Sequence, residues 1–264
     1  MAQLRENIRR ITLACCTLVL AVSAYAQRNA SREIGLTWAD GIVVDGNLED
    51  WGDSLTNQYA SQDLQYQLKN DGTHVYVAMR VVDRDRQMQV LSQGFSFMVN
   101  TSGRRRPGPT VVYPIADRLS FRAIMSADND DRPEDMREGG LQAIRAIYVL
   151  RFDDILDGQI SLDNEYGIHA EALIDSTDAL CFEAKVPLRR LGIRSGFDQE
   201  LAFNVKINGM IAPRRTTDNR AMRQRGGYYG SPYGYGYGYG QPTQSRPREE
   251  PGTWLISVLA NSNK

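Results

Sequence analysis

The chain has 264 residues, with 31 basic and 32 acidic side chains and a formal net charge of −1. This balance argues against nucleic acid or an anionic membrane surface as the partner, because both select a basic excess. The length suits one domain with insertions that buries its core without disulfide bonds.

Residues 1–26 have the features of a signal peptide. Three arginines precede the apolar run ITLACCTLVLAVSA, and Ala24-Tyr25-Ala26 forms an A-x-A cleavage site. The sequence predicts cleavage between Ala26 and Gln27 and an exported protein, periplasmic or at the cell surface. Cys181 is the one cysteine of the mature chain, so no internal disulfide is expected. No second apolar span follows, and we expect no transmembrane segment in the mature chain.

Most of the remaining segments predict β-strands. Leu64, Tyr66 and Leu68 alternate with polar residues, and residues 70–72 (Asn-Asp-Gly) then form a turn before the β-branched run HVYVAMRVVD. Further strands are expected at 94–100, 168–174, 179–188, 201–209 and 253–260, with a second hairpin turn at 175–178. Since no regular strand–helix alternation occurs, we predict an all-β, antiparallel β-sandwich.

Two segments depart from the strand pattern. Residues 133–147 begin with proline and acidic residues and then space apolar residues as one short helix would. Residues 212–252 have almost no aliphatic side chains, which predicts a disordered loop between the last two strands. Its Tyr/Gly run holds six tyrosines: Tyr228, Tyr229, Tyr233, Tyr235, Tyr237 and Tyr239. We therefore divide the chain into a signal peptide (1–26), a lead-in (27–40) and a sandwich domain (41–264).

Several motifs resemble family 9-like carbohydrate-binding modules, which are DOMON-like β-sandwiches. The segments IVVDGNLEDW, HVYVAMRVVDRD, CFEAKVPLRRLGI and LAFNVKING resemble strands of that family in the same order, over most of residues 41–260. GFSFMVNTSGRRRPGPTVVYP is similar to a segment of exported bacterial proteins with this domain. The resemblance implies a sandwich of jelly-roll or immunoglobulin-like topology.

The tryptophans depart from the family's binding pattern. Characterised members of the family hold a sugar between two tryptophans. In the mature chain, Trp51 falls on the family's packing tryptophan and Trp254 on the closing strand, and neither matches a clamp position.

The stretch DGNLEDW, residues 45–51, combines a turn with three carboxylates. Asp45 and Gly46 suit a turn, because aspartate caps backbone N–H groups and glycine accepts positive φ. Leu48 and Trp51 are three residues apart and are expected to enter a core together. A glycosidase needs two carboxylates at a set separation across a cleft, which one local cluster does not show.

Candidate ligand-binding residues lie in three other places. The arginine run after the strand at 94–100 can bind carboxylates or phosphates, or it can be a solvated loop. The candidates are Asp83, Asp85, Arg104, Arg105, Arg106 and Tyr113.

No cofactor is expected. His74 and His169 stand at strand starts without zinc-ligand spacing. The acidic cluster at 128–131 offers oxygens to Ca²⁺ but lacks the EF-hand spacing, so a solvated loop is the stronger interpretation.

These patterns favour a non-catalytic module that binds a glycan or a cell-envelope protein. The alternative is a structural or protein-interaction scaffold whose contact surface is the Tyr/Gly-rich loop. A hydrolase is a remote third interpretation, because no nucleophile elbow, H-E-x-x-H or P-loop motif occurs.

Overall fold

The structure is a computed structural model, and it describes residues 34–59, 61–126, 133–194, 196–209 and 252–262. The predicted signal peptide, the Tyr/Gly run with its six tyrosines and the acidic cluster at 128–131 lie outside the described residues. Within the described ranges, no helix is long and apolar enough to cross a membrane.

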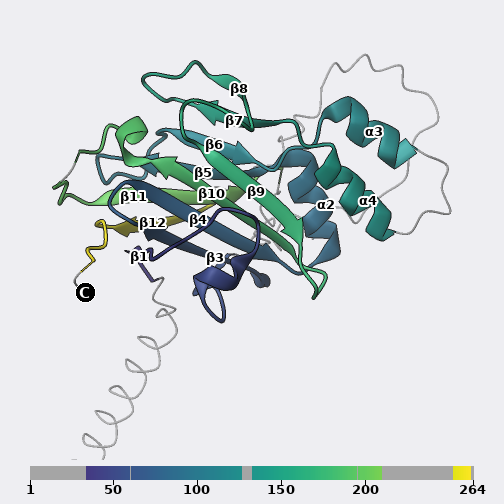
Figure 1. Cartoon of the computed structure of the whole chain (residues 1–264), viewed down its shortest axis with the longest axis horizontal. Helices are drawn as coiled ribbons and strands as arrows, with labels where there is room; N and C mark the ends of the chain where they lie inside the picture. The colour runs from purple at the N-terminus through teal and green to yellow at the C-terminus, as the bar shows by residue number, and fades with distance from the viewer. Residues whose placement is uncertain (1–33, 60, 127–132, 195, 210–251, 263–264) are drawn as a thin grey trace, which may run out of the picture.

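In the described ranges, twelve strands form two six-stranded sheets that face each other (Figure 1). Sheet A has the order β1-β3-β4-β10-β9, and β2 pairs with β3 along the edge that β1 also contacts. Sheet B has the order β12-β11-β5-β6-β7-β8. Sheet A contains β1 (Thr37–Trp38), β2 (Asn57–Tyr59), β3 (Ser61–Asn70), β4 (His74–Val81), β9 (His169–Ile174) and β10 (Leu180–Pro187). Sheet B contains β5 (Phe95–Asn100), β6 (Thr110–Tyr113), β7 (Ala146–Leu150), β8 (Gly158–Ser161), β11 (Leu201–Ile207) and β12 (Thr253–Ser257).

The chain changes sheets three times, so neither sheet is a separate unit. It builds β1 to β4 in sheet A, β5 to β8 in sheet B, β9 and β10 in sheet A, and the last two strands in sheet B. All pairings are antiparallel except that of β1 with β3. The all-β antiparallel sandwich expected from the sequence is confirmed.

The main core lies between the two sheets, where alternating strand residues meet. Phe182 of β10 packs against Phe95 of β5 and Tyr113 of β6, with ring centroids 5.4 and 5.6 Å apart. All three side chains are buried. Period-two alternation along each strand sends every second side chain into this layer.

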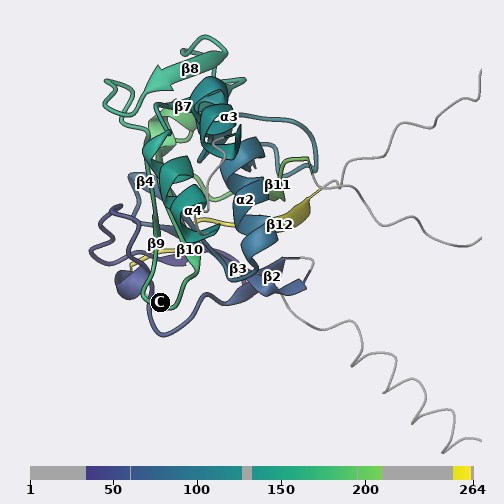
Figure 2. The same ribbon diagram turned by 90° about the vertical axis from the view of Figure 1, so that its right-hand side faces the viewer.

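The three α-helices of the described residues lie together at one end of the sandwich (Figures 1 and 2). They are α2 (Arg84–Gln93), α3 (Arg118–Ser126) and α4 (Pro133–Gln142); two short 3-10 helices are η1 (Leu48–Trp51) and η2 (Leu188–Leu191). Val90 and Leu91 of α2 are buried in the main core, so α2 closes this end of the space between the sheets.

The short helix expected at 133–147 forms as α4, but it ends at Gln142, and Ala146 already begins β7. The described residues contain two further helices, α2 and α3, that the strand-based interpretation missed. Residues 34–40, the described part of the expected lead-in, also contribute to the fold, since β1 pairs with β3 and Leu36 is buried in the main core.

Candidate functional site

The stretch DGNLEDW folds into a turn followed by the 3-10 helix η1. The Asp45 carboxylate accepts a hydrogen bond from the backbone N–H of Asn47 at 2.8 Å, and Gly46 has φ +85°. The Asn47 side chain in turn accepts from the Glu49 N–H and caps η1. Asp45 and Gly46 thus lie in a turn that leads into η1.

Glu183 of β10 anchors this segment to sheet A. Its carboxyl group is fully buried and accepts hydrogen bonds from the Trp51 indole N–H and from the backbone N–H groups of Asp45 and Gly46, the last two at 3.1 and 2.8 Å. Burial raises the pKa of Glu183 to about 7, against the opposing effect of these donors. One carboxyl group thus holds both ends of the motif.

Trp51 packs in a small cluster on the outer face of sheet A. The ring is 4% exposed and contacts residues such as Tyr76 and Ala78, not the core between the sheets. The ammonium group of Lys69 lies 5.0 Å from the ring centroid. Trp51 was expected to enter a core, and the core that it joins is this outer cluster, because the N-terminal segment crosses over sheet A.

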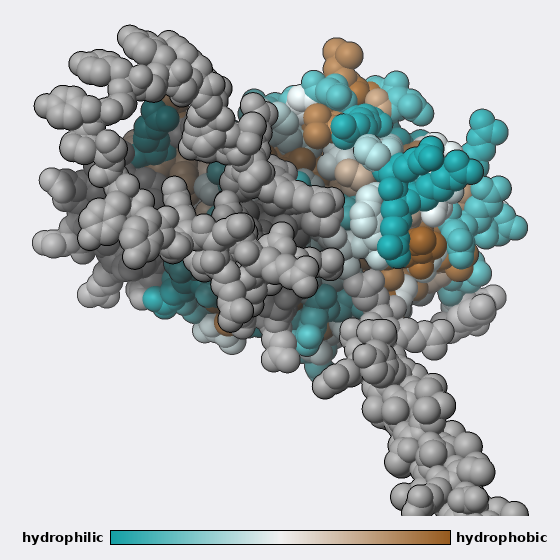
Figure 3. Space-filling view, turned by 180° about the vertical axis from the view of Figure 1, so that it is seen from behind, coloured by the Kyte–Doolittle hydropathy of each residue, from teal (hydrophilic) through white to brown (hydrophobic). Residues whose placement is uncertain are grey.

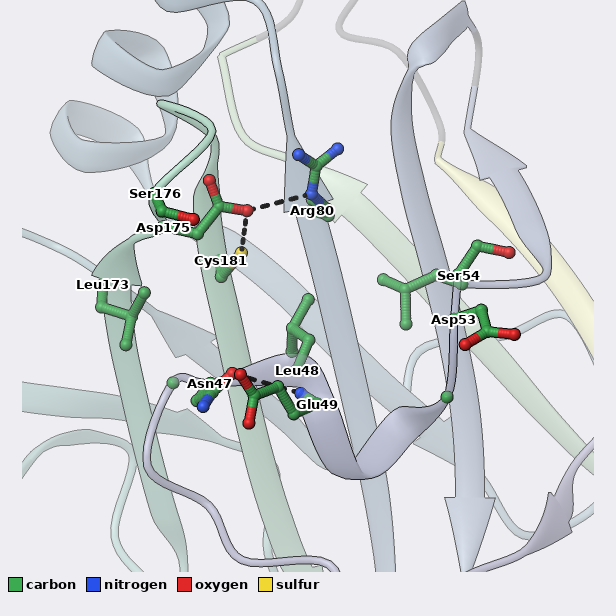
Figure 4. A pocket seen from close by; sticks show the side chains of 13 residues that line it. Asn47, Leu48, Glu49, Asp53, Ser54, Arg80, Leu173, Asp175, Ser176 and Cys181 are labelled. Atoms are coloured by element: carbon green, nitrogen blue, oxygen red, sulfur yellow. Dashed lines mark hydrogen bonds and ion pairs between the residues drawn. The ribbon is translucent and has the colours of Figure 1, made fainter.

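A cleft of about 260 Å³ separates the motif from the outer face of sheet A (Figure 4). Asn47, Leu48 and Glu49 form one wall, and Arg80 and Cys181 of sheet A contribute to the other. The remaining lining residues are Gly46, Gly52, Asp53, Ser54, Leu55, Leu173, Asp175 and Ser176.

The polar groups of the sheet wall already bind one another. The Asp175 carboxylate lies 3.2 Å from Arg80 Nε, and it accepts from the hydroxyl and the N–H of Thr177. Burial works to raise the pKa of Asp175, but these hydrogen bonds and Arg80 outweigh it and lower the value to about 2. Burial also raises the pKa of Cys181 to about 12, so its thiol stays protonated near neutral pH and is a poor nucleophile.

A second, larger hollow lies where α2 and α3 meet the β7–β8 edge of sheet B. We call it the groove, and it has two neighbouring parts of about 790 and 530 Å³ that share the lining residues Ser92, Gln93 and Phe121. Tyr148 of β7 and Gln159 of β8 line the sheet side. Other lining residues are Met88, Gln89, Ile115, Ala116, Asp117, Arg122, Arg145, Ala146 and Gly209.

The polar side chains that line the groove make fewer hydrogen bonds and ion pairs within the protein than those of the cleft. Among the described residues, the side chains of Gln93, Arg122, Tyr148 and Gln159 make no hydrogen bond or ion pair with one another or with the rest of the fold. Tyr148 alternates with the buried Ile147 and is half-buried at the surface of sheet B. These groups can bind a ligand without breaking an internal bond.

Two groups of the groove are held in place. Arg145 donates from Nη1 to the backbone carbonyls of Gln142 and Ile144, the latter at 2.8 Å, which fixes its otherwise exposed guanidinium group. Asp117 accepts from the N–H and hydroxyl of Ser120 at 2.9 and 2.8 Å, which lowers its pKa and occupies Oδ1.

The candidate ligand-binding residues from the sequence do not come together. Asp83 caps the first turn of α2 by accepting from the Arg86 N–H at 2.9 Å, and Asp85 is exposed in that turn. The arginine run at 104–106 is exposed in the turn before β6, whereas the groove is lined by residues of α2, of the segment from β6 to α3, and of the β7–β8 edge. None of these residues lines the groove or the cleft.

Tyr113 requires a correction. It was expected to bind a ligand, but it is 3% exposed and its ring packs on Phe182 in the main core. Burial raises the pKa of its hydroxyl group above the usual range. The reason is the alternation of β6, which directs Tyr113 between the sheets.

Two residues that are central to the cleft segment and the groove in the structure, Glu183 and Tyr148, were not identified from the sequence. Glu183 is the one carboxylate inside the apolar strand CFEAKV, and an acid in that position is a signal for a buried partner. Tyr148 was hidden because its segment was assigned to a helix; the alternation in AIYVL marks it as an outward-facing aromatic residue.

Comparisons with known proteins add little beyond this geometry. No protein-family model matches the sequence, and no curated protein sequence matches it. Among solved structures, the chain is similar to a family 9 carbohydrate-binding module (CBM9) from Caldicellulosiruptor kristjanssonii, determined in complex with glucose. The two chains share 12% identity with a TM-score of 0.33, over 65% of this chain and 75% of that chain. A likeness at this level transfers no ligand and no binding residue.

Proposed function

We propose that the protein is a non-catalytic binding module that recognises a glycan through the groove beside Tyr148. The observation that supports the proposal is the half-buried ring of Tyr148 in the groove, surrounded by polar side chains that bind no other described residue. The glycan class of ligand, and not its identity, is what this chemistry supports.

A sugar ring suits such a surface for a physical reason. One face of the ring exposes C–H groups that pack on an aromatic side chain, and its hydroxyl groups accept and donate hydrogen bonds. Tyr148 supplies the aromatic face, while the amides of Gln93 and Gln159 offer both donors and acceptors. Because these side chains bind no other described residue, a ligand competes only with water for them.

The same lining favours binding over hydrolysis. Hydrolysis of a glycoside needs two carboxyl groups that face each other across the scissile bond. In the described part of the chain, the groove is lined by one carboxylate, Asp117, and its Oδ1 is already occupied by Ser120. A binding role needs no such pair.

The test is binding of the mature protein to a glycan array, followed by affinity electrophoresis on the glycans that respond. We expect Tyr148→Ala to weaken binding at least tenfold, since loss of an aromatic hot spot commonly has an effect of this size. The matched control is Asp53→Asn in the cleft, which should leave binding unchanged. Binding that survives Tyr148→Ala but not Asp53→Asn would place the ligand in the cleft and overturn the assignment to the groove.

Export from the cytoplasm is part of the proposal, because an envelope or extracellular glycan requires it. The support is the signal-peptide pattern of residues 1–26. N-terminal sequencing of the protein recovered from the envelope fraction should give Gln27 as the first residue. Recovery of an intact Met1 from that fraction would contradict the cleavage.

A further inference from the structure

The groove has a charge pattern that its sugar-binding chemistry does not by itself require. Two guanidinium groups line it, from Arg122 on α3 and from Arg145 just before β7. Both side chains are exposed. The one carboxylate of the described lining, Asp117, accepts hydrogen bonds from Ser120 at the start of α3, and the charge of Arg145 also helps to lower its pKa.

The two arginines differ in the contacts that hold their guanidinium groups. Arg145 is fixed by the two backbone carbonyls that its Nη1 contacts, and its other N–H groups donate to no described residue. Arg122 makes no ion pair with any described residue, so its charge is not neutralised within this part of the fold. Guanidinium groups bind planar or tetrahedral oxyanions through paired N–H donors.

We propose that the ligand of the groove is an acidic saccharide, whose anionic substituent is bound by Arg122 and Arg145 while its ring packs on Tyr148. This inference rests on the proposed function and narrows it to one substrate class. A neutral glycan would leave Arg122 without a charged partner and the remaining N–H groups of Arg145 in water, whereas an anionic substituent gives both guanidinium groups a charged acceptor. The anion can be a carboxylate or a sulfate, since both present oxygens that match the arginine fork.

The experiment uses matched polymers with the mature protein. The panel consists of polyuronates, each polymer with its carboxyl groups reduced to hydroxymethyl groups, and each reduced polymer after sulfation. The inference predicts binding to the polyuronate or to the sulfated polymer that is at least tenfold tighter than binding to the reduced polymer, with affinity that falls as salt rises. These two arms separate a carboxylate from a sulfate as the recognised group.

Two sets of variants test which arginine side chains bind the anionic group of the polymer. Arg122→Gln should weaken binding of the acidic polymer about tenfold, the effect of one charged hydrogen bond, and should leave binding of the reduced polymer unchanged. The control is Arg104→Gln combined with Arg105→Gln, which removes two positive charges from an exposed turn outside the groove. Loss of affinity in the control but not in Arg122→Gln would show non-specific or misplaced charge recognition and overturn the inference.

The failures of the two proposals are distinguishable. Equal affinity for acidic and reduced polymers, lost on Tyr148→Ala, would overturn the acidic-saccharide inference and keep the glycan-binding groove. Binding to no polymer of the panel and to no glycan of the array would overturn both proposals. Arg145→Gln serves as a second variant only after circular dichroism shows an intact fold, because its contacts also hold the chain between α4 and β7.

Discussion

Replacement of Trp51 by phenylalanine tests how the N-terminal segment is held on sheet A. The ring is 4% exposed, and its N–H donates to Glu183, which is fully buried. Phenylalanine keeps most of the ring but has no donor, so the variant isolates the hydrogen bond from the packing. At pH 8 the acceptor is largely ionised, since the pKa of Glu183 is about 7.

The expected magnitude follows from this geometry. A hydrogen bond to a charged acceptor contributes about 1.5–3 kcal/mol, and we expect Trp51→Phe to lower the free energy of unfolding by that amount at pH 8. At pH 5 the carboxyl group is mostly neutral, and the loss should fall to about 1 kcal/mol. Trp51→Ala removes the ring from the outer cluster as well as the hydrogen bond, and it should cost about 3–5 kcal/mol at pH 8.

The assay is urea unfolding followed by far-UV circular dichroism, because tryptophan fluorescence changes with the substitution itself. The matched control is Trp38→Phe, whose half-buried ring makes no hydrogen bond to a described residue and should change stability by less than about 0.5 kcal/mol. An unchanged midpoint for Trp51→Phe at pH 8 would refute the anchor. An equal loss at pH 5 and pH 8 would show that packing, and not the charged hydrogen bond, carries the effect.

Three further predictions concern pH, a buried arginine and the Tyr/Gly segment. Because the pKa of Glu183 is raised from 4.5 to about 7, the folded state binds a proton that the unfolded state releases, so unfolding free energy should fall by about 3 kcal/mol as pH rises from 4 to 8. Glu183→Gln should flatten this part of the urea profile, and a profile parallel to wild type would contradict the assignment. Arg137 is 2% exposed and donates hydrogen bonds to Gln87 and Asp178, whereas the more exposed Arg84 also forms an ion pair with Asp178. Arg137→Met should therefore lower the urea midpoint clearly more than Arg84→Met. Equal shifts would argue against a structural role for the buried contacts of Arg137. Deletion of residues 223–248 should leave the urea midpoint and glycan binding unchanged, because this segment has almost no aliphatic side chains that could join a core. An unfolded deletion variant would show that the segment is needed for the fold. Loss of envelope-protein capture alone would support the alternative in which the Tyr/Gly-rich loop binds a protein partner.

Local sequence patterns predicted the elements whose signals are short in range. The hairpins β3–β4 and β9–β10 form at the polar turns where they were expected, because the turn residues and the period-two alternation act within a few positions. Helix α2 had a readable start in Asp83, whose side chain caps it, and a readable end before Gly94. It was missed because a β-branched strand runs directly into that cap and suggested an extended segment.

The sites depend on pairs that are remote in the sequence, and no local pattern could predict them. Trp51 and Glu183 are 132 positions apart, and their contact exists only because the N-terminal segment crosses β10. Tyr148 and Phe121 line one groove because α3 returns toward β7 after the chain leaves β6. The sequence supplied the residue types, while the topology of the two sheets decided which of them meet.

The two hollows therefore differ in what a polar ligand must displace. In the cleft, Arg80 and Asp175 already bind each other, and a ligand that recruits either must first break an internal ion pair. A group left unpaired in a partly buried site costs about 1–3 kcal/mol, which an incoming hydroxyl group would do little more than offset. In the groove, Tyr148 and Arg122 have no partner to lose among the described residues. The same polar contacts thus yield more net binding free energy in the groove than in the cleft. For this reason we propose that the groove binds the ligand, and that the cleft and the DGNLEDW segment contribute to the stability of the fold.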